Sequence, residues 1–226
     1  MKQQNLKFLE KKEINNKIFL ISFESNEENE DFLPGQFLSI KFSSEISRSY
    51  SIFSIEKKII KILVDTSFGG FASKKFEDMN IGEVFSAILP IGKFILQKNE
   101  NKKVFISTGT GISPFIPMIK EIRKENSKIQ ISVFFGTQTV LNDFSKELLD
   151  EFENIDLTIC VSKENLNQEF NKNLRIKSGR ITENFDPKNF DLERTDFYIC
   201  GHPEMVSDVV KILQNAKAKN IFFEKY

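Results

Sequence analysis

The sequence predicts an α+β protein of two domains, an antiparallel Greek-key β-barrel followed by an α/β domain with a parallel sheet. Two patterns carry this prediction. Up to about residue 97 the chain consists of short strand-like runs broken by turns, which is typical of a small antiparallel barrel. From Lys103 onward, apolar strands alternate with amphipathic helices, as in a parallel sheet with crossover helices. We expect the domains at residues 1–98 and 103–226, with the polar segment 98–102 marking the boundary.

Apolar periodicity and turn residues predict the individual elements. In the first domain we expect strands at residues 18–23, 37–42, 49–55 and 59–64, and a helix at 73–79. The turn signal Pro34-Gly35 leads into the second of these strands. In the second domain we expect strands at 104–107, 129–135, 155–161 and 197–200, and helices at 114–125, 144–152 and 204–216.

Composition excludes several classes of protein. The chain has 226 residues, and its 32 Lys and Arg balance its 32 Asp and Glu, so no global charge favours nucleic acid. No apolar run approaches the roughly 18 residues of a membrane span, and the amino terminus lacks the apolar core of a secretion signal, so we expect a cytoplasmic protein. The two cysteines, Cys160 and Cys200, are too few for a four-cysteine iron–sulfur cluster within these residues. The lone His202 has no partners for a metal site, and we expect no metal.

Arg48-Ser49-Tyr50-Ser51 is the first motif that indicates chemistry. It lies in an expected strand, so Arg48 and Tyr50 would share a face. Arg48 offers a planar fork of donors to a pyrophosphate, and Tyr50 offers a flat ring with a polar tip. Ser51 can bind through its hydroxyl or its backbone. The alternative is that these are ordinary surface and packing residues.

Three further segments carry glycine where a ligand could approach the backbone. Gly69-Gly70 precedes the expected helix, where close backbone approach and free amides favour an anion; the alternative is a glycine hairpin capped by Ser73. Residues 109–114, Gly-Thr-Gly-Ile-Ser-Pro, follow an apolar strand and open a helix, as a phosphate loop does, although a plain strand–helix turn is a rival. Cys200-Gly201 ends a strand at the edge where open α/β sheets bind ligands; the alternative is a buried cysteine followed by a turn.

In this order, the four segments resemble the ferredoxin–NADP reductase superfamily. Its flavin motif is Arg-x-Tyr-Ser, and its nicotinamide motifs are Gly-x-Gly-x-x-Pro and Cys-Gly-x-x-x-Met. The resemblance extends from Pro34 to Tyr226. It implies FAD and NADP(H) as cofactors, hydride transfer from NADPH to flavin N5 where the two domains meet, and delivery of single electrons to ferredoxin or flavodoxin. Any second redox centre would come from that partner, and we expect a monomer.

The resemblance also implies roles for individual residues. Ser51 and Cys200 would position the two rings, Glu224 would relay the flavin proton, and Tyr226 would stack on the flavin and move aside for nicotinamide. The residues expected at the flavin are Arg48, Ser49, Tyr50, Ser51, Val64, Gly69, Gly70, Phe71, Ala72 and Ser73. The residues expected at the nicotinamide dinucleotide are Thr108, Gly109, Thr110, Gly111, Pro114, Gly136, Thr137, Ser162, Lys163, Cys200, Gly201, Met205 and Tyr226. Of these, Thr110 would also lie close to the flavin.

The choice between NADPH and NADH depends on Ser162-Lys163, which end the expected strand 155–161. A 2′-phosphate favours a hydroxyl and a cation, whereas an NAD site would more naturally offer a carboxylate to the ribose. NADP-dependent relatives usually have Arg after this Ser, and many also have Arg where this chain has Gln138. Lys163 supplies a point charge without the bidentate fork, so we expect NADPH with a relaxed preference. The alternative is a solvated loop.

Two other functions stay open. One keeps the fold but reduces free flavin or serves as the reductase component of an oxygenase or other multicomponent system. The other is a regulatory module that senses nicotinamide without turnover, which the intact segment 48–51 disfavours. Lys74, Lys75 and Lys93 are candidate contacts for an acidic electron carrier, although any one of them can serve solubility alone.

Overall fold

The computed structural model describes residues 1–15, 17–126, 128–139, 151–152, 154–165, 168–171 and 173–225. Its contacts divide the chain into two compact units. The first, here the barrel unit, comprises Met1–Leu96 and Ser113–Glu121; the second, here the sheet unit, comprises Gln97–Ile112 and Ile122–Tyr226. Each unit is described by itself. None of the helices in the described ranges is long and apolar enough to cross a membrane.

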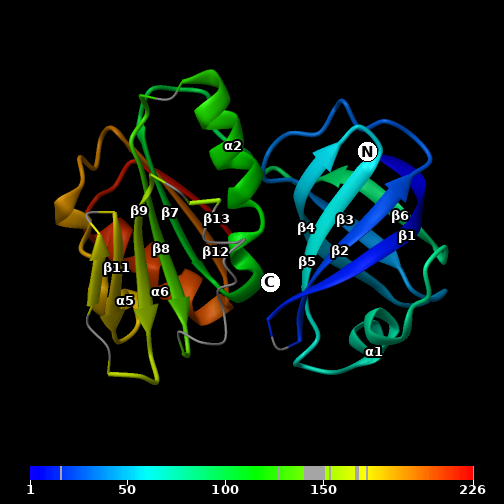
Figure 1. Ribbon diagram of the computed structural model, residues 1–226. Coiled ribbons are helices and arrows are strands. Elements are labelled where there is room, and N and C mark those ends of the chain that lie inside the picture. Colours follow the sequence, from blue (N-terminus) through cyan, green and yellow to red (C-terminus); the bar gives the residue numbers. More distant parts are fainter. Residues whose placement is uncertain are drawn as a thin grey trace. The chain divides into compact units, whose positions relative to one another are not determined.

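The barrel unit contains the predicted antiparallel Greek-key barrel (Figure 1). Its described strands are β1 (Lys2–Asn15), β2 (Ile18–Ser25), β3 (Phe37–Lys41), β4 (Ser47–Glu56), β5 (Ile59–Asp65) and β6 (Val84–Ile91). They close in the order β1-β2-β5-β4-β3-β6, and each neighbouring pair is antiparallel. Helix α1 (Phe71–Asp78) connects β5 to β6 and lies at one end of the barrel.

Strands β1 and β6 were absent from the sequence prediction. In β1, the buried apolar side chains Leu6 and Phe8 stand among charged and amide residues, so the strand has no run of apolar residues. Both edges of β1 are nevertheless paired, with β2 and with β6, because the barrel is closed. Aromatic rings fill the core behind it: Phe23 contacts Phe8 and Phe85 edge to face, with ring centroids 6.2 and 6.0 Å apart.

The sheet unit contains the predicted parallel sheet. Its described strands are β7 (Lys102–Thr108), β8 (Ile131–Thr137), β9 (Asp156–Val161), β10 (Gln168–Asn171), β11 (Leu174–Ser178), β12 (Thr195–Gly201) and β13 (Asn220–Lys225). Their order is β10-β11-β9-β8-β7-β12-β13, and every neighbouring pair except β10–β11 is parallel. The chain runs outward from β7 through β8 to β9, then returns to place β12 on the other side of β7. The pair β7–β12 is therefore the switch point of the sheet.

The described helical segments after β7 are η1 (Gly109–Ile112), α2 (Phe115–Glu125), α5 (Ile181–Asn184), η2 (Pro187–Asn189) and α6 (Pro203–Asn215), and most of α2 belongs to the barrel unit. One face of the sheet packs on α5 and α6 through Val104, Phe197 and Ile199 and their neighbours. The short strands β10 and β11 were not predicted, and β8 begins two residues later than expected. The predicted helix 144–152 falls mainly outside the described residues.

The opposite face of β7, β12 and β13 carries three rows of side chains, because residues in register on parallel strands share a face. From the amino ends of the strands, the rows are Lys103, Asp196 and Asn220; Phe105, Tyr198 and Phe222; and Ser107, Cys200 and Glu224. In the middle row the Tyr198 ring lies 5.3 Å from that of Phe105 and 5.0 Å from that of Phe222. This face therefore changes from charged to aromatic to polar along the strands.

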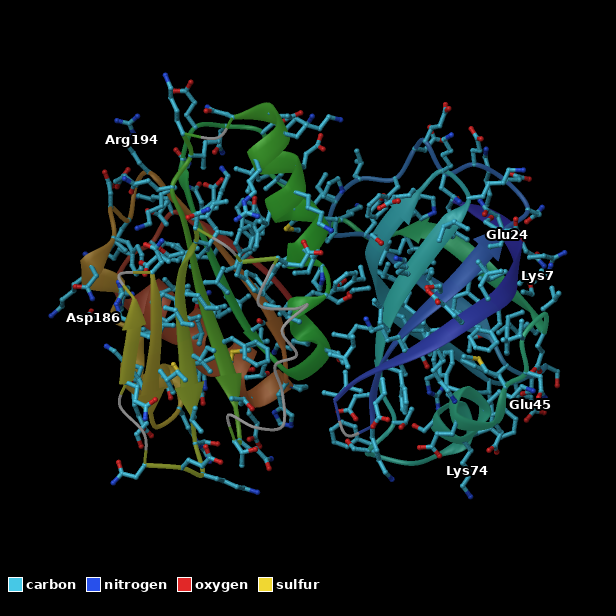
Figure 2. All side chains as sticks on the ribbon, viewed as in Figure 1. Lys7, Glu24, Glu45, Lys74, Asp186 and Arg194 are labelled. Atoms are coloured by element: carbon cyan, nitrogen blue, oxygen red, sulfur yellow. The ribbon has the colours of Figure 1, made fainter. Side chains whose placement is uncertain are left out.

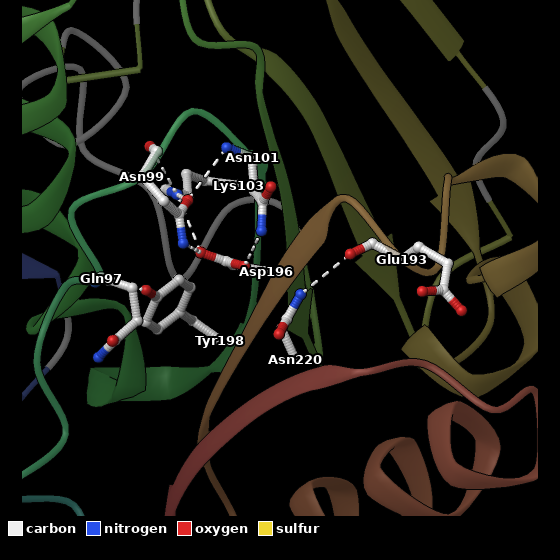
Figure 3. Close-up of polar contacts among 8 residues, drawn as sticks. All are labelled: Gln97, Asn99, Asn101, Lys103, Glu193, Asp196, Tyr198 and Asn220. Atoms are coloured by element: carbon white, nitrogen blue, oxygen red, sulfur yellow. Dashed lines mark hydrogen bonds and ion pairs between the residues drawn. The ribbon is translucent and has the colours of Figure 1, made fainter.

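The charged row is a buried ion pair with its own amide partners (Figure 3). Lys103 Nζ lies 2.9 Å from Asp196 Oδ2, and each side chain is 1% exposed. Asn101 and Asn99 donate to the two oxygens of Asp196 at 2.8 and 3.0 Å. The hydroxyl of Tyr198 accepts the backbone N–H of Gln97 at 2.8 Å. Residues 97–101 are therefore bound to the sheet at three points.

Lys103→Met should lower the free energy of unfolding by about 3–5 kcal/mol, because it leaves the buried Asp196 carboxylate without its counter-charge. Urea unfolding of the purified protein measures this change. Lys98→Met is the matched control, since Lys98 pairs with Glu125 at the surface and should contribute no more than about 1 kcal/mol. Equal losses in the two variants would contradict the importance given to the buried pair.

Candidate functional site

The predicted flavin motif lies on β4 in the barrel unit. Arg48 is paired in register with Ile40 of β3, and Tyr50 with Leu38, so Arg48 and Tyr50 leave the same face of the strand. The Arg48 side chain is exposed, and Tyr50 is half-buried. This arrangement presents a cation and an aromatic ring side by side, as the sequence predicted.

The Tyr50 ring is held in place by two phenylalanines. Phe42 and Phe76 meet it nearly edge-on, with centroids 6.5 and 5.3 Å away. Phe76 is fully buried and belongs to α1, so the ring of Tyr50 and the helix are in direct contact. Burial raises the pKa of the Tyr50 hydroxyl well above its ordinary value, opposed in part by the charge of Arg48, so the phenol stays neutral.

Helix α1 begins with an uncapped turn. Gly70 is its N-cap residue, and no side chain caps the helix. Gly70 has a φ of 94°, which favours glycine, and a Cβ added at Gly69 or Gly70 would meet nothing within 4 Å. The space around both glycines is therefore open, and no side chain caps the first amides of α1, which is an arrangement that suits a phosphate. The helix starts ahead of Ser73, so the alternative of a hairpin capped by Ser73 is not observed.

Sequence analysis missed two residues near α1, Lys11 and Phe68. Lys11 of β1 donates from Nζ to the carbonyl oxygens of Phe76 at 2.9 Å and Glu77 at 2.6 Å, and so binds the carboxyl end of α1 to the barrel. Phe68 precedes the glycines and is 87% exposed, while Phe71 follows them and is 54% exposed. Lys11 is more than sixty residues from its partners in the sequence, so no local pattern could reveal it.

Other predicted flavin residues of the barrel unit differ in accessibility. Ser51 is 4% exposed, and its carbonyl oxygen accepts a hydrogen bond from Ser113 Oγ at 3.2 Å. Val64 is 3% exposed and belongs to the barrel core, so only its backbone is available to a ligand. Ser49 is exposed, and Ala72 and Ser73 lie half-buried in the first turn of α1.

In the sheet unit, the turn after β7 touches the end of β12 where two glycines meet. A Cβ at Gly111 would lie 2.7 Å from the Cα of Gly201. Gly201 has a φ of 136°, and a Cβ there would lie 2.8 Å from the carbonyl oxygen of Thr108. Both positions exclude any side chain, so the backbone at the switch point is bare on both strands. Gly109 is exposed, with nothing within 4 Å of an added Cβ.

Thr108 links three elements at this edge. Its Oγ1 accepts the backbone N–H of His202 at 3.1 Å, which holds the start of α6 against the turn. A Cβ at Gly136 would lie 2.9 Å from Thr108 Cγ2 and from Ile181 Cδ1, so β8 also approaches closely. The remaining predicted residues are placed as follows: Thr110 is half-buried, Pro114 is buried, Thr137 is 8% exposed, and Met205 is half-buried against the α6 core.

The polar row of the sheet lies next to these glycines. Cys200 is fully buried and directly precedes Gly201. Glu224 is half-buried, and its Oε2 has no hydrogen-bond partner among the described residues. Burial raises the pKa of Glu224 from 4.5 to about 6. Tyr226, the predicted gate, lies outside the described residues.

Ser162 and Lys163 follow β9, two strands away from β7. Both side chains are exposed. Ser162 Oγ donates to the carbonyl oxygen of Thr137 at 3.2 Å. The backbone N–H of Lys163 donates to the carbonyl oxygen of Gln138 at 2.9 Å. The loop is thus fixed by β8, while the Lys163 ammonium group is presented to solvent.

The sites in the two units are therefore of two kinds. The barrel unit joins Tyr50 to an open, uncapped helix start, and these residues fit the ring and pyrophosphate of FAD. The sheet unit gathers Thr108, Gly111, Gly201 and the polar row at the switch point, where α/β sheets bind dinucleotides. Fold and sites together define a two-domain flavin- and dinucleotide-binding oxidoreductase.

Comparison with known protein families agrees with this class. Residues 5–95 match the oxidoreductase FAD-binding domain, and residues 105–211 match the oxidoreductase NAD-binding domain. The chain therefore carries an oxidoreductase FAD-binding domain followed by an oxidoreductase NAD-binding domain, which agrees with the resemblance of its motifs to the ferredoxin–NADP reductase superfamily.

Individual relatives are distant. The chain is 25% identical to the toluate 1,2-dioxygenase electron transfer component of Pseudomonas putida, over 86% of this chain and 59% of that protein. It is 25% identical to the anthranilate 1,2-dioxygenase electron transfer component of Acinetobacter baylyi, over 79% of this chain and 53% of that protein. The chain thus spans little more than half the length of these relatives. A ferredoxin NADP+ reductase from Neisseria gonorrhoeae has the same fold, with a TM-score of 0.78, 20% identity, and coverage of 100% and 99% of the two chains.

Glu224→Gln should change how stability depends on pH. Because the pKa of Glu224 is higher in the folded state, its stabilising contribution is full below pH 4.5 and is lost as pH rises through about 6. The variant should therefore unfold at nearly the wild-type temperature at pH 4.5 and at a higher temperature at neutral pH. Thermal unfolding followed by circular dichroism across this range measures the difference.

Glu204→Gln is the control, since Glu204 is an exposed carboxylate of the same unit and should give no pH-dependent gain. An equal gain of Glu224→Gln at pH 4.5 and at neutral pH would contradict the assigned titration.

Proposed function

We propose that the chain is a ferredoxin- or flavodoxin-type NADP+ reductase, which oxidises NADPH and reduces a one-electron protein carrier through FAD. The observation that carries this proposal is the open turn at Gly69-Gly70, joined through α1 to the ring of Tyr50. One helix thus connects a phosphate-type turn to an aromatic ring, as a ligand with a pyrophosphate and a planar ring system requires.

In this proposal, the chain's own residues hold and orient both ligands. Arg48 and the first amides of α1 hold the flavin pyrophosphate, while Tyr50 supports the flavin ring and Ser51 bonds to it. Thr108, Gly109 and Gly111 receive the dinucleotide, and Cys200 positions its nicotinamide. Glu224, with its pKa near 6, holds or releases a proton close to neutral pH. When bound, FAD would accept two electrons as a hydride and release them singly.

The number of electrons released per NADPH determines how many carrier molecules are reduced. Each NADPH oxidised yields two electrons and one proton, so two one-electron carriers are reduced per turnover. Lys74, on α1 beside the proposed flavin site, is exposed and points into solvent (Figure 2), where an acidic carrier could meet it. Lys75 is less available, because it pairs with Glu83 and lies over the ring of Phe85.

We also propose that the protein is a monomer and lies in the cytoplasm.

A second candidate function is the reductase component of a multicomponent oxygenase. The two electron transfer components that are 25% identical to this chain favour it. In that case the same two half-reactions serve a different acceptor, which is a dedicated partner rather than a general carrier.

FAD binding and acceptor choice test the proposal together. The purified protein should bind FAD and become yellow, and with NADPH it should reduce ferredoxin or flavodoxin faster than free flavin. A preference for free flavin would favour a flavin reductase, and failure of all three acceptors would favour a dedicated oxygenase partner. A folded, colourless protein that binds nicotinamide but no FAD would indicate the sensing module instead.

Arg48→Ala should weaken FAD binding about tenfold, because it removes a charge-assisted contact to the pyrophosphate. Arg194→Ala is the control: Arg194 is an exposed arginine of the sheet unit, and its loss should leave FAD affinity unchanged. Fluorescence titration of the apoprotein with FAD measures both. Equal effects would contradict the role of Arg48.

Lys163→Ala tests the preference for NADPH. If Lys163 reads the 2′-phosphate, kcat/KM for NADPH should fall about tenfold while that for NADH stays the same. Lys188→Ala, at another exposed lysine of the same unit, should affect neither nucleotide. A parallel loss with both nucleotides would reject the role of Lys163.

A further inference from the structure

Ser107, on β7, carries a buried hydroxyl group. The residue is 0% exposed, and its Oγ has no hydrogen-bond partner among the described residues. A buried hydroxyl that has lost its water and found no replacement destabilises the folded state. Alanine at this position would avoid that cost, so the hydroxyl calls for an explanation.

The location of Ser107 in the sheet indicates why its hydroxyl is kept. On the three-row face, the charged and aromatic rows are satisfied, since Asp196 accepts from Lys103, Asn99 and Asn101 and Tyr198 accepts from Gln97. Among the described residues of this face, the buried unpartnered atoms lie in the row at the carboxyl edge, where Ser107 is in register with Cys200, and Cys200 with Glu224.

These two unpartnered groups complement one another chemically. The Ser107 hydroxyl can donate a hydrogen bond, and Glu224 Oε2 can accept one. A primary carboxamide needs one donor for its oxygen and one acceptor for its NH2 group. The row directly precedes the bare backbone of the Thr108–Gly109 turn and of Gly201, where the dinucleotide is proposed to bind.

We infer that Ser107 is a further binding residue for the nicotinamide end of the dinucleotide, donating to the carboxamide oxygen while Glu224 accepts from its NH2 group. This inference rests on the proposed function. Ser107 and Cys200 are fully buried in the present structure, so binding of the ring requires the side chains packed around them to rearrange. The missing hydrogen bond of Ser107 is then supplied by the ligand.

Ser107→Ala tests the inference because it separates binding from stability. The variant should unfold about 2–4 °C above the wild type, because it no longer buries an unpaired hydroxyl. It should bind NADP+ roughly threefold to tenfold more weakly, the loss expected for one hydrogen bond. Binding of 2′-phospho-ADP-ribose, which lacks the nicotinamide, should stay unchanged. Calorimetry with both ligands and thermal unfolding of the free protein give these values.

Ser132→Ala is the matched control. Ser132 is a buried serine of the same sheet whose Oγ is satisfied by Asp156 at 3.3 Å, so the variant should lose stability and keep its affinity for both ligands. Unchanged NADP+ affinity in Ser107→Ala, or an equal loss for both ligands, would overturn the inference. If the wild type bound neither ligand, the proposed function itself would fail, which is a different result.

Discussion

The sheet unit depends on the contact between the turn after β7 and the end of β12, which have no side chains at the point where they meet. Gly111 and Gly201 bring the turn after β7 and the end of β12 within van der Waals distance, and any Cβ there would overlap backbone atoms. This contact places Thr108 where it holds the start of α6. Gly109, at the start of the same turn, is exposed, so a long dinucleotide can approach backbone amides there instead of side chains. The chemistry of the site is thus a consequence of packing that only glycine permits.

The three-row face shows how one sheet surface combines stability with binding. At the amino edge, every polar group of the ion pair is matched, which fixes residues 97–101 to the sheet. The stacked rings of Phe105, Tyr198 and Phe222 separate that edge from the carboxyl edge. At the carboxyl edge, polar atoms lack partners within the described chain. On this face, the satisfied groups fix residues 97–101 to the sheet, and the unsatisfied groups lie where a ligand is expected.

The sequence predicted those parts of the fold that local patterns encode. The barrel, the parallel sheet, and the turns at Gly69, Gly109 and Gly201 follow from periodicity and from glycine at strand ends. Strand β1 escaped prediction because a closed barrel pairs both its edges and needs few apolar residues from it. The Lys103–Asp196 pair was not predicted for another reason. A lysine beside a polar linker is typical of a surface residue, and its partner lies 93 residues away in the sequence. Ser107 was passed over because a lone serine in an apolar strand has no signature. Burial and missing partners become visible only in three dimensions.

The bond between Lys11 and α1 has a consequence for maturation of the protein. A two-turn helix is marginal by itself, so α1 relies on Phe76 in the core and on Lys11 at its carboxyl end. Lys11 belongs to the first strand, and that strand also closes the barrel by pairing with the last. The ordered form of α1 therefore depends on closure of the barrel, so a ligand held at the start of α1 would require the first and last strands to be paired.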